Sequence, residues 1–395
     1  MAHSRVSQID LIQARVTEIP DGWSLCKVID ALNIRNNLRK PISQEVRETI
    51  VGDYPYYGPT KIQGYISEFE QDGTFALIGE DGDHFLKYST MPQTQLISGK
   101  CTVNNHAHIL ESSGKCDSEW FFNYFKHRDI TNFLSRQGAG RFKLNKATLE
   151  KLPLLVPPLP EQRKIAKILS IWDKAIATTE KLIDTSKQQK KALMQQLLTG
   201  KKRLVNPETG KAFEGDWRKV ELGKLLDYKQ PTPYLVKSTE YSNEYPTPVL
   251  TAGKTFILGY SDEDFGIFRE ELPAIIFDDF TTASKFVDFP FKAKSSAMKI
   301  LIAKDGVSIK YVYEAMQILN YPIGGHQRHW ISIFANLVIG LPKPEEQQKI
   351  ASVLTAADKE IDVFEVKLAH FKQEKKALMQ QLLTGKRRVK VAETE

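Results

Sequence analysis

The sequence lacks the features of membrane and secreted proteins. Its 395 residues contain no apolar run approaching the roughly 18 residues that a transmembrane helix needs. The first residues, MAHSRVSQIDLIQARV, contain no apolar signal-peptide segment. There are only three cysteines, Cys26, Cys101 and Cys116, and none is in a CxxC spacing, which argues against a zinc site or a disulfide framework. We therefore expect a cytoplasmic protein.

The signatures of catalysis are also absent. The sequence contains no GxxxxGK[ST] phosphate loop, no GxGxxG after a strand, no HExxH and no Asn-Pro-Pro-Tyr methyltransferase motif. His106 and His108 form an HxH on an expected strand, which would place both on one face, but no third metal ligand is apparent. Asp278 and Asp279 lack the companion lysine of a nuclease site and fit a turn or strand end. We expect a chain that catalyses no reaction and binds no metal or cofactor.

The dominant feature that is present is a long segment written twice. Residues 161–203 and 346–388 align without a gap at a constant offset of 185 residues, the difference between Glu161 and Glu346. Within them, KKALMQQLLTGK is identical from Lys190 to Lys201 and from Lys375 to Lys386. Internal repeats identify the units from which a chain is built, so this segment predicts a tandem duplication.

Each copy is predicted to be one long helix. Apolar residues recur every three to four positions in two heptad columns over about five heptads, as in a coiled coil. Each helix should run about 39 residues, or roughly 58 Å. Prolines precede the first turn, acids lie inside it, and Gly200 and Gly385 occupy the expected C-caps. The predicted seam comprises Ile165, Leu169, Trp172, Ile176, Ile183, Leu193 and Leu197 in the first copy, and Ile350, Leu354, Ile361, Phe364, Leu368, Phe371, Leu378 and Leu382 in the second.

The two seams differ in a complementary way. Phe364 and Phe371 of the second copy correspond to Thr179 and Ser186 of the first. Bulky residues opposite small ones favour packing of the two helices on each other. The alternative is that each helix lies separately on its own globular domain.

The segments before each helix are predicted to be mixed α/β domains without a βαβ rhythm. We expect domains at 1–155 and 205–338 and helical regions at 156–204 and 339–395, so the architecture is globular–helix–globular–helix with pseudo-twofold symmetry. Expected strands are TFALIGEDG, KCTVNNHAHIL, PAIIFDDF and FVDFPFKA, and expected helices are Glu119–Ser135, with Trp120, Phe121, Phe125 and Phe133 buried, and Ser308–Leu319.

Composition and several clusters are compatible with nucleic-acid binding. Net charge is +7 and the pI is about 9.0. An aromatic Gly/Pro-rich loop, an amide-rich triplet and basic residues beside glycines could contact bases and phosphates. Each cluster could equally form an ordinary surface, and the basic ends 201–203 and 386–388 are expected to be solvated helix ends. The candidates are Tyr54, Tyr56, Tyr57, Lys61, Asn104, Asn105, His106, Arg136, Arg141, Lys143, Lys285, His326, Gln327 and Arg328.

The repeated EQ-x-K-I-A followed by KKALMQQLLTGK resembles the specificity subunit of type I restriction–modification systems, over essentially the whole chain. The resemblance implies a non-catalytic subunit in which two target recognition domains each recognise half of a bipartite site in double-stranded DNA. It implies an antiparallel coiled coil that sets the spacer and docks two methyltransferase subunits, with restriction–translocase subunits completing the complex. S-adenosylmethionine, ATP and Mg would then be bound by those partners.

Other classes remain open at this point. A modification-only orphan subunit and a coiled-coil adaptor that does not bind DNA share the duplicated helix. A self-contained nuclease or methyltransferase is disfavoured by the missing motifs.

Overall fold

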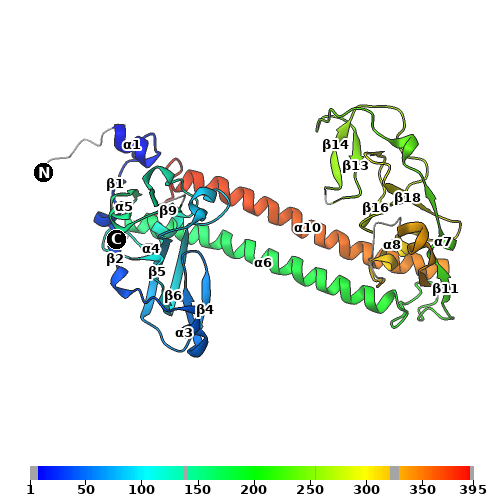
Figure 1. Cartoon of the computed structure of the whole chain (residues 1–395), viewed down its shortest axis with the longest axis horizontal. Helices are drawn as coiled ribbons and strands as arrows, with labels where there is room; N and C mark the ends of the chain where they lie inside the picture. Colours follow the sequence, from blue (N-terminus) through cyan, green and yellow to red (C-terminus); the bar gives the residue numbers. More distant parts are fainter. Residues whose placement is uncertain (1–7, 138–140, 254, 321–328, 392–395) are drawn as a thin grey trace. The chain divides into compact units, whose positions relative to one another are not determined.

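The chain divides into two compact units. The computed structural model describes residues 8–137, 141–253, 255–320 and 329–391. Unit 1 comprises Met1–Thr178 and Leu368–Glu395, and unit 2 comprises Thr179–Lys367. The boundaries fall inside two long helices, so each unit contains one globular domain and part of both helices (Figure 1).

The two long helices match the predicted length. α6 (Leu159–Leu197) and α10 (Pro344–Leu382) each contain 39 residues. Gly200 and Gly385 adopt left-handed φ values of 72° and 71° just beyond the helix ends. Glycine reaches this conformation without a Cβ penalty, so the predicted C-caps are confirmed.

A six-stranded sheet forms the centre of the globular domain of unit 1. Its order is β2-β7-β5-β6-β3-β4, and all neighbours are antiparallel except β3 and β6. α4 packs against β5 and β6. The strands are β2 (Asn33–Ile34), β3 (Val51–Tyr57), β4 (Ile62–Ile66), β5 (Gln71–Gly79), β6 (Thr94–Val103) and β7 (Ala107–Glu111), with a separate hairpin of β8 (Ser135–Gln137) and β9 (Arg141–Lys143). The helices are α1 (Gln8–Ala14), α2 (Val28–Ala31), α3 (Gln44–Thr49), α4 (Ser118–Phe125) and α5 (Lys146–Lys151).

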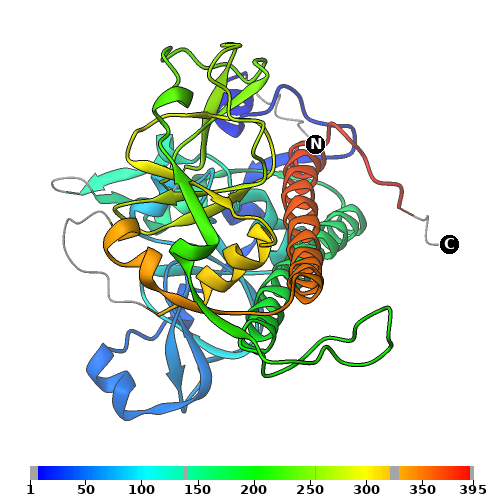
Figure 2. The same ribbon diagram turned by 90° about the vertical axis from the view of Figure 1, so that its right-hand side faces the viewer.

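Unit 2 contains two smaller sheets. One has the order β12-β18-β15-β16 and the other β14-β13-β17. α8 lies against β15 and β16 (Figure 2). The strands are β12 (Leu226–Lys229), β13 (Thr247–Leu250), β14 (Ile257–Ser261), β15 (Ala274–Asp278), β16 (Ser284–Val287), β17 (Lys292–Ala293) and β18 (Met298–Ala303). The helices are α7 (Leu222–Leu225), α8 (Ile309–Gln317) and α9 (His329–Ser332).

Each globular domain leads into its long helix through the same strand pair. In unit 1, β1 (Ser24–Lys27) pairs antiparallel with β10 (Pro153–Val156), which immediately precedes α6. In unit 2, β11 (Arg218–Glu221) pairs with β19 (Val338–Leu341), which immediately precedes α10. The duplication therefore includes the strand pair as well as the helix.

The main core of each unit is shared between the globular domain and both helices. In unit 1, Leu169 of α6 and Leu382 of α10 pack with Trp120 and Phe121 of α4. In unit 2, Leu197 of α6 and Leu354 of α10 pack with the apolar face of α8 in the same manner. The end of one helix and the start of the other thus complete each core.

Three secondary-structure expectations were wrong. KCTVNNHAHIL is not one strand, because the chain turns between β6 and β7. The helix expected over Glu119–Ser135 ends at Phe125, although Phe133 still packs on the same core. FVDFPFKA forms two short strands, β16 and β17. The predicted helix over Ser308–Leu319 is confirmed as α8, with Ser308 accepting from the Tyr311 N–H as N-cap.

Candidate nucleic-acid interface

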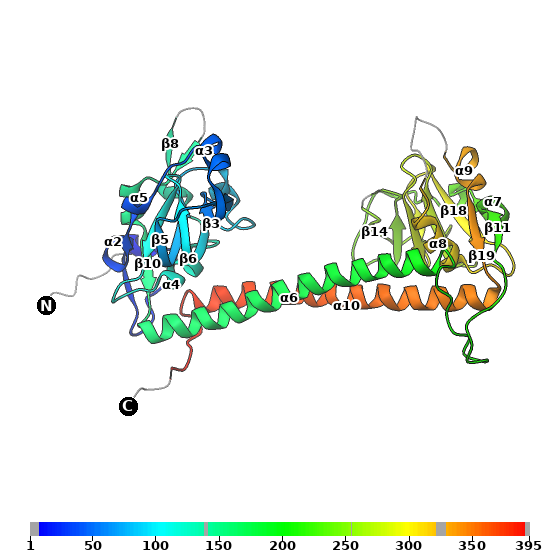
Figure 3. The ribbon, with the colours of Figure 1, turned by 90° about the horizontal axis from the view of Figure 1, so that it is seen from below.

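Four candidate residues meet around a hollow of about 410 Å³ at one edge of unit 1. It is bounded by α3, the β3–β4 hairpin and the β6–β7 turn, and α3 lies at the end of the unit away from α6 (Figure 3). The lining residues are Pro41, Ile42, Ser43, Arg47, Tyr56, Gln63, Asn104, Asn105 and His106.

Tyr56 forms part of the wall of this hollow. Its side chain is 1% exposed. Its hydroxyl accepts from the Ile42 N–H at 2.9 Å and donates to the Lys40 carbonyl at 3.0 Å. The Arg47 guanidinium lies 5.0 Å from the ring centroid. Tyr56 therefore fixes the segment leading into α3 through its hydroxyl, and its direct contact with nucleic acid stays a prediction.

The β6–β7 turn presents one exposed amide side chain, that of Asn105. Asn104 is 5% exposed. Its Nδ2 donates to Gln63 Oε1 at 2.8 Å, and its Oδ1 accepts from the His106 N–H at 2.8 Å. Asn105 is exposed at the tip. Of these two asparagines, Asn104 is therefore structural, and only the side chain of Asn105 is available to a ligand.

An ionic cluster around Glu80 supports the β6–β7 turn. Arg39 contacts Glu80 at 2.7 Å and Lys143 contacts it at 3.2 Å. Burial opposes ionisation of Glu80, but Arg39, His108 and Lys143 outweigh it, so the pKa of Glu80 lies below its usual 4.5. The Glu80 N–H donates to the His106 carbonyl at 2.8 Å, which ties the cluster to the turn. Lys143 is therefore paired with Glu80 and is not among the residues that line the hollow.

The two histidines of the HxH do not share a face. His106 is in the turn, exposed, with Nδ1 3.0 Å from Asp81 Oδ2. His108 is fully buried in β7, with Nε2 2.7 Å from the Leu144 carbonyl oxygen. Burial is the main cause that lowers the pKa of His108 below 6.5. The same-face expectation was wrong because β7 begins at Ala107, and the interpretation of a packed histidine is confirmed for His108.

The remaining candidates in unit 1 lie around this edge or apart from it. Tyr57 is half-buried, and its carbonyl accepts the Asn104 N–H at 3.0 Å. Lys61 is exposed between β3 and β4. Tyr54 packs edge-on against Phe69, with ring centroids 5.0 Å apart.

The described basic candidates further along the chain do not line the hollow, and others lie outside the described residues. Arg136 is exposed in β8, with its guanidinium 5.1 Å from the Phe142 ring centroid. Lys285 is exposed on β16 in unit 2. Arg141 belongs to β9, but its side chain, together with His326, Gln327 and Arg328, lies outside the described residues.

Arg39, Arg47 and Gln63 are part of this edge and were missed from the sequence. Gln63 is adjacent to no motif, so no local signal identifies it. Arg39 and Arg47 belong to the basic segment RNNLRKPISQEVR, whose charge is the one signal that could have identified them.

Each long helix begins at an anchor of one tryptophan, one glutamate and one arginine. In the first helix anchor, Trp23 Nε1 donates to Glu161 at 3.0 Å. Arg388 donates Nε and one terminal nitrogen to the same carboxylate, both at 2.8 Å. Glu161 is 3% exposed. Burial opposes its ionisation, but Arg388 and Trp23 outweigh burial, so the pKa of Glu161 lies below 4.5.

The second helix anchor repeats this geometry in unit 2. Trp217 Nε1 donates to Glu346 at 3.1 Å, and Arg203 donates to both oxygens at 2.6 and 2.7 Å. Each arginine lies 5.6 Å from the ring centroid of its tryptophan. Both arginines were expected to be solvated helix ends. The structure shows that a buried carboxylate from the other repeat binds each of them, although Arg388 stays partly exposed.

The glutamine after each glutamate attaches a helix of the globular domain. Gln162 Oε1 accepts from the Asp117 N–H at the start of α4, and Gln347 Oε1 accepts from the Ser308 N–H at the start of α8, both at 2.9 Å. Their amide groups donate to the carbonyls of Pro157 and Pro342. The repeated Glu-Gln pair thus holds the globular domain on its helix.

Inside unit 1, α6 and α10 run antiparallel. Trp172 and Phe371 meet edge to face with centroids 5.7 Å apart, and Asp173 binds Lys375. Glu161 of α6 binds a residue beyond the end of α10, so numbers rise along one helix as they fall along the other. Phe371 thus contacts a bulky partner here, although the expectation was a small one.

Inside unit 2, the helices pair in the same sense. Lys187 binds Glu365 and Lys190 binds Asp358, each at 2.6 Å. Lys190 and Lys375 are equivalent positions of the repeat, as are Asp358 and Asp173. Packing of the copies on each other is therefore observed in both units, and their ends also lie in the globular cores.

All predicted seam residues are buried or half-buried. Thr179 and Ser186 are 4% and 8% exposed. Among the described residues, no group of three His, Cys, Asp or Glu side chains could hold a metal, and no helix is long and apolar enough to cross a membrane.

Comparison with known proteins shows which family this chain resembles. A family model described as type I restriction modification DNA specificity domain matches residues 20–187 and 214–370. The chain is 46% identical over 156 residues to the type I restriction enzyme EcoR124I/EcoR124II specificity subunit of Escherichia coli, covering 38% of each chain. It is 27% identical over 422 residues to the putative type I restriction enzyme MjaX specificity subunit of Methanocaldococcus jannaschii, covering 96% of each.

A solved structure shares the fold. The S subunit of a type I restriction–modification system from M. genitalium matches with a TM-score of 0.68 at 14% identity, covering 93% of this chain and 96% of that one. The family match includes both globular domains and most of both long helices. The chain therefore belongs to the type I restriction–modification DNA specificity family.

Proposed function

We propose that the chain is the DNA-specificity subunit of a type I restriction–modification complex, in which each globular domain recognises half of a bipartite site in double-stranded DNA. The observation that carries this is the family match in two copies, each spanning one globular domain and most of its helix. The hollow of unit 1 supports it, because an exposed amide and basic side chains lie together there. Amides and guanidinium groups are the side chains that recognise base edges and phosphates.

The helix pair supplies the attachment surface in this proposal. Two methyltransferase subunits dock on the repeated helices, because a duplicated surface offers two equivalent sites. Restriction–translocase subunits join the same complex. The chain itself is non-catalytic, and S-adenosylmethionine, ATP and Mg are bound by the partners, in the cytoplasm.

Exchanging one globular domain tests the proposal. Residues 24–156 are replaced by the corresponding domain of another specificity subunit, and methylated adenines are mapped across a host genome by long-read sequencing. The expected result is that one half-site changes while the other half-site stays the same. Loss of both half-sites, or no change in either, would contradict separate recognition by the two domains.

The adaptor alternative predicts a different result for the reconstituted complex. A chain that only joins proteins would assemble with the methyltransferase subunits without sequence-specific duplex binding. A modification-only orphan would methylate but support no cleavage when restriction subunits are added. Neither is favoured by any feature of the described residues over the leading proposal.

The two asparagines of the β6–β7 turn should respond differently to alanine. Asn105→Ala is expected to weaken specific duplex binding by the reconstituted complex by about 1–3 kcal/mol, because one base-edge contact is lost. Asn104→Ala should lower the free energy of unfolding by about 1–2 kcal/mol, because two internal hydrogen bonds disappear. Fluorescence anisotropy and thermal unfolding measure the two effects. If Asn105→Ala leaves binding unchanged, the turn does not contact DNA.

A further inference from the structure

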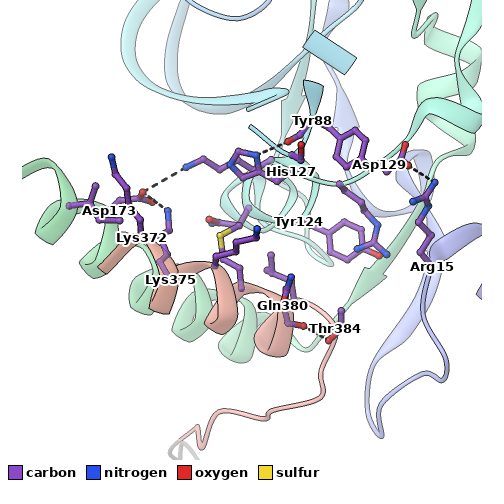
Figure 4. A pocket seen from close by; sticks show the side chains of 18 residues that line it. Arg15, Tyr88, Tyr124, His127, Asp129, Asp173, Lys372, Lys375, Gln380 and Thr384 are labelled. Carbon is purple, nitrogen blue, oxygen red and sulfur yellow. Dashed lines mark hydrogen bonds and ion pairs between the residues drawn. The ribbon is translucent and has the colours of Figure 1, made fainter. Parts of the chain in front are cut away.

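A cavity of about 620 Å³ opens inside unit 1 between the globular domain and the two helices. Figure 4 shows Tyr124 and His127 on the domain side facing Asp173 and Lys375 on the helix side. A volume of this size lies in the range of small-molecule sites, which form preferentially between packed elements.

The charges in this cavity are unbalanced. Asp173 binds Lys375, and Lys126 Nζ lies 3.8 Å from the same carboxylate. One carboxylate thus serves two ammonium groups, and Lys376 lines the cavity as well. Burial and then the charge of Lys375 lower the pKa of Lys126, as expected for a cation without enough counter-charge.

The Lys190–Asp358 pair of unit 2, which corresponds to Lys375 and Asp173 of unit 1, belongs to a balanced cluster. Lys190 lies 2.6 Å from Asp358 and 3.2 Å from Glu314. Lys310 lies 2.8 Å from Glu314 and 3.1 Å from Asp358. Two carboxylates therefore serve two ammonium groups, and Glu314 is fully buried among them.

Asn123 occupies in unit 1 the position that Glu314 occupies in unit 2. The glutamines of the two repeats bind the N–H of Asp117 and of Ser308, which aligns α4 with α8. The residues six positions after Asp117 and Ser308 are Asn123 and Glu314, respectively. Asn123 lines the cavity with a neutral amide, so unit 1 has no carboxylate at this position, and Asp129, the other carboxylate in the lining, binds Arg15.

We propose that this cavity binds a small organic phosphate, of the nucleoside monophosphate class, whose phosphate supplies the missing negative charge beside Lys126, Lys375 and Lys376. The organic body of the ligand lies against Ile176, Met379 and Leu383, which give the cavity an apolar wall. Phosphate groups bind lysine ammonium groups strongly where water is partly excluded. The site is separate from the candidate nucleic-acid interface and does not depend on DNA recognition.

Calorimetric titration of the purified full-length chain with AMP tests the proposal. The expected result is saturable binding at one site per chain, with adenosine and inorganic phosphate each binding at least tenfold more weakly. Absence of saturable AMP binding would overturn the site. Equal binding of adenosine would overturn the role of the phosphate, and equal binding of inorganic phosphate would overturn that of the organic body.

Three variants locate the site. Asn123→Asp restores a carboxylate, and Lys376→Ala removes an exposed cation, so each should weaken AMP binding at least tenfold. Lys191→Ala is the matched control, because Lys191 is exposed and occupies the same repeat position in unit 2, and it should change binding less than twofold. Thermal unfolding verifies that each variant is folded. Unchanged binding in Asn123→Asp, or equal weakening in Lys191→Ala, would overturn the assignment.

Discussion

Leu169→Asp is expected to unfold unit 1, and Leu354→Asp is expected to unfold unit 2. Both leucines are fully buried, and each packs in the core that its long helix shares with a globular domain. Removing a buried leucine side chain costs about 2–5 kcal/mol, and an unpaired carboxylate in the same place adds several more. The sum is comparable with the whole stability of a typical domain, about 5–15 kcal/mol. Chemical denaturation and limited proteolysis measure the loss.

The same helices provide matched controls. Ile171 is 58% exposed and Val363 is 64% exposed, so Ile171→Asp and Val363→Asp should change the free energy of unfolding by less than about 0.5 kcal/mol. Leu169→Asp should also abolish assembly with methyltransferase subunits. Normal assembly of that variant would show that docking does not need an intact helix in unit 1.

The long helices were predictable because their signals are local. Heptad spacing, the preceding prolines and the capping glycines all lie within the helix or next to it, so 39-residue helices follow from the sequence. The offset of 185 residues also indicated that the globular segments are related. The partners of Trp23 and Trp217, Glu161 and Glu346, were not predicted from the sequence.

Local patterns were less informative inside the globular domains. Apolar spacing after Phe125 correctly indicated that Phe133 packs on the core, where it is partly buried, but it could not show that the chain leaves the helix. Tertiary contacts decide this, because Asp129 binds Arg15 at 2.7 Å and accepts from Thr131 at the start of the next turn. Apolar spacing indicates which side chains are buried, whereas the residue at which a helix ends depends on such specific contacts.

Contacts distant in sequence account for what was missed at the candidate sites. The side-chain amide of Asn104 donates to Gln63, which lies 41 positions earlier in the chain. Arg388 is bound by Glu161, 227 positions away. Neither pairing leaves a trace in spacing or composition, so an amide expected to be available and a cation expected to be solvated both proved to be structural.

Glu161→Ala is expected to detach the globular domain of unit 1 from the start of α6. The substitution leaves the Trp23 N–H and the Arg388 guanidinium without their acceptor. Breaking a buried ion pair costs about 3–5 kcal/mol, but the Arg388 side chain is 42% exposed and water can replace part of the lost interaction. We therefore expect a loss of about 2–3 kcal/mol in the free energy of unfolding.

A double-mutant cycle separates the ion pair from the rest of the anchor. Arg388→Ala alone should cost less than Glu161→Ala, because the carboxylate keeps the Trp23 hydrogen bond. If the two groups stabilise each other, the double variant will lose less than the sum of the single variants, by about 1–3 kcal/mol. Additive losses would mean that Arg388 and Glu161 act independently.

The pH dependence of stability gives an independent measure of the first helix anchor. The pKa of Glu161 is lower in the folded chain than its usual 4.5, so the unfolded state binds the proton more readily. The contribution of the carboxylate is therefore complete above the unfolded pKa and is lost as pH falls through the folded pKa. The stability difference between the wild type and Glu161→Gln should be largest near pH 7 and should shrink toward about pH 3. A difference that stays constant over this range would show that the charge of Glu161 does not hold the anchor together.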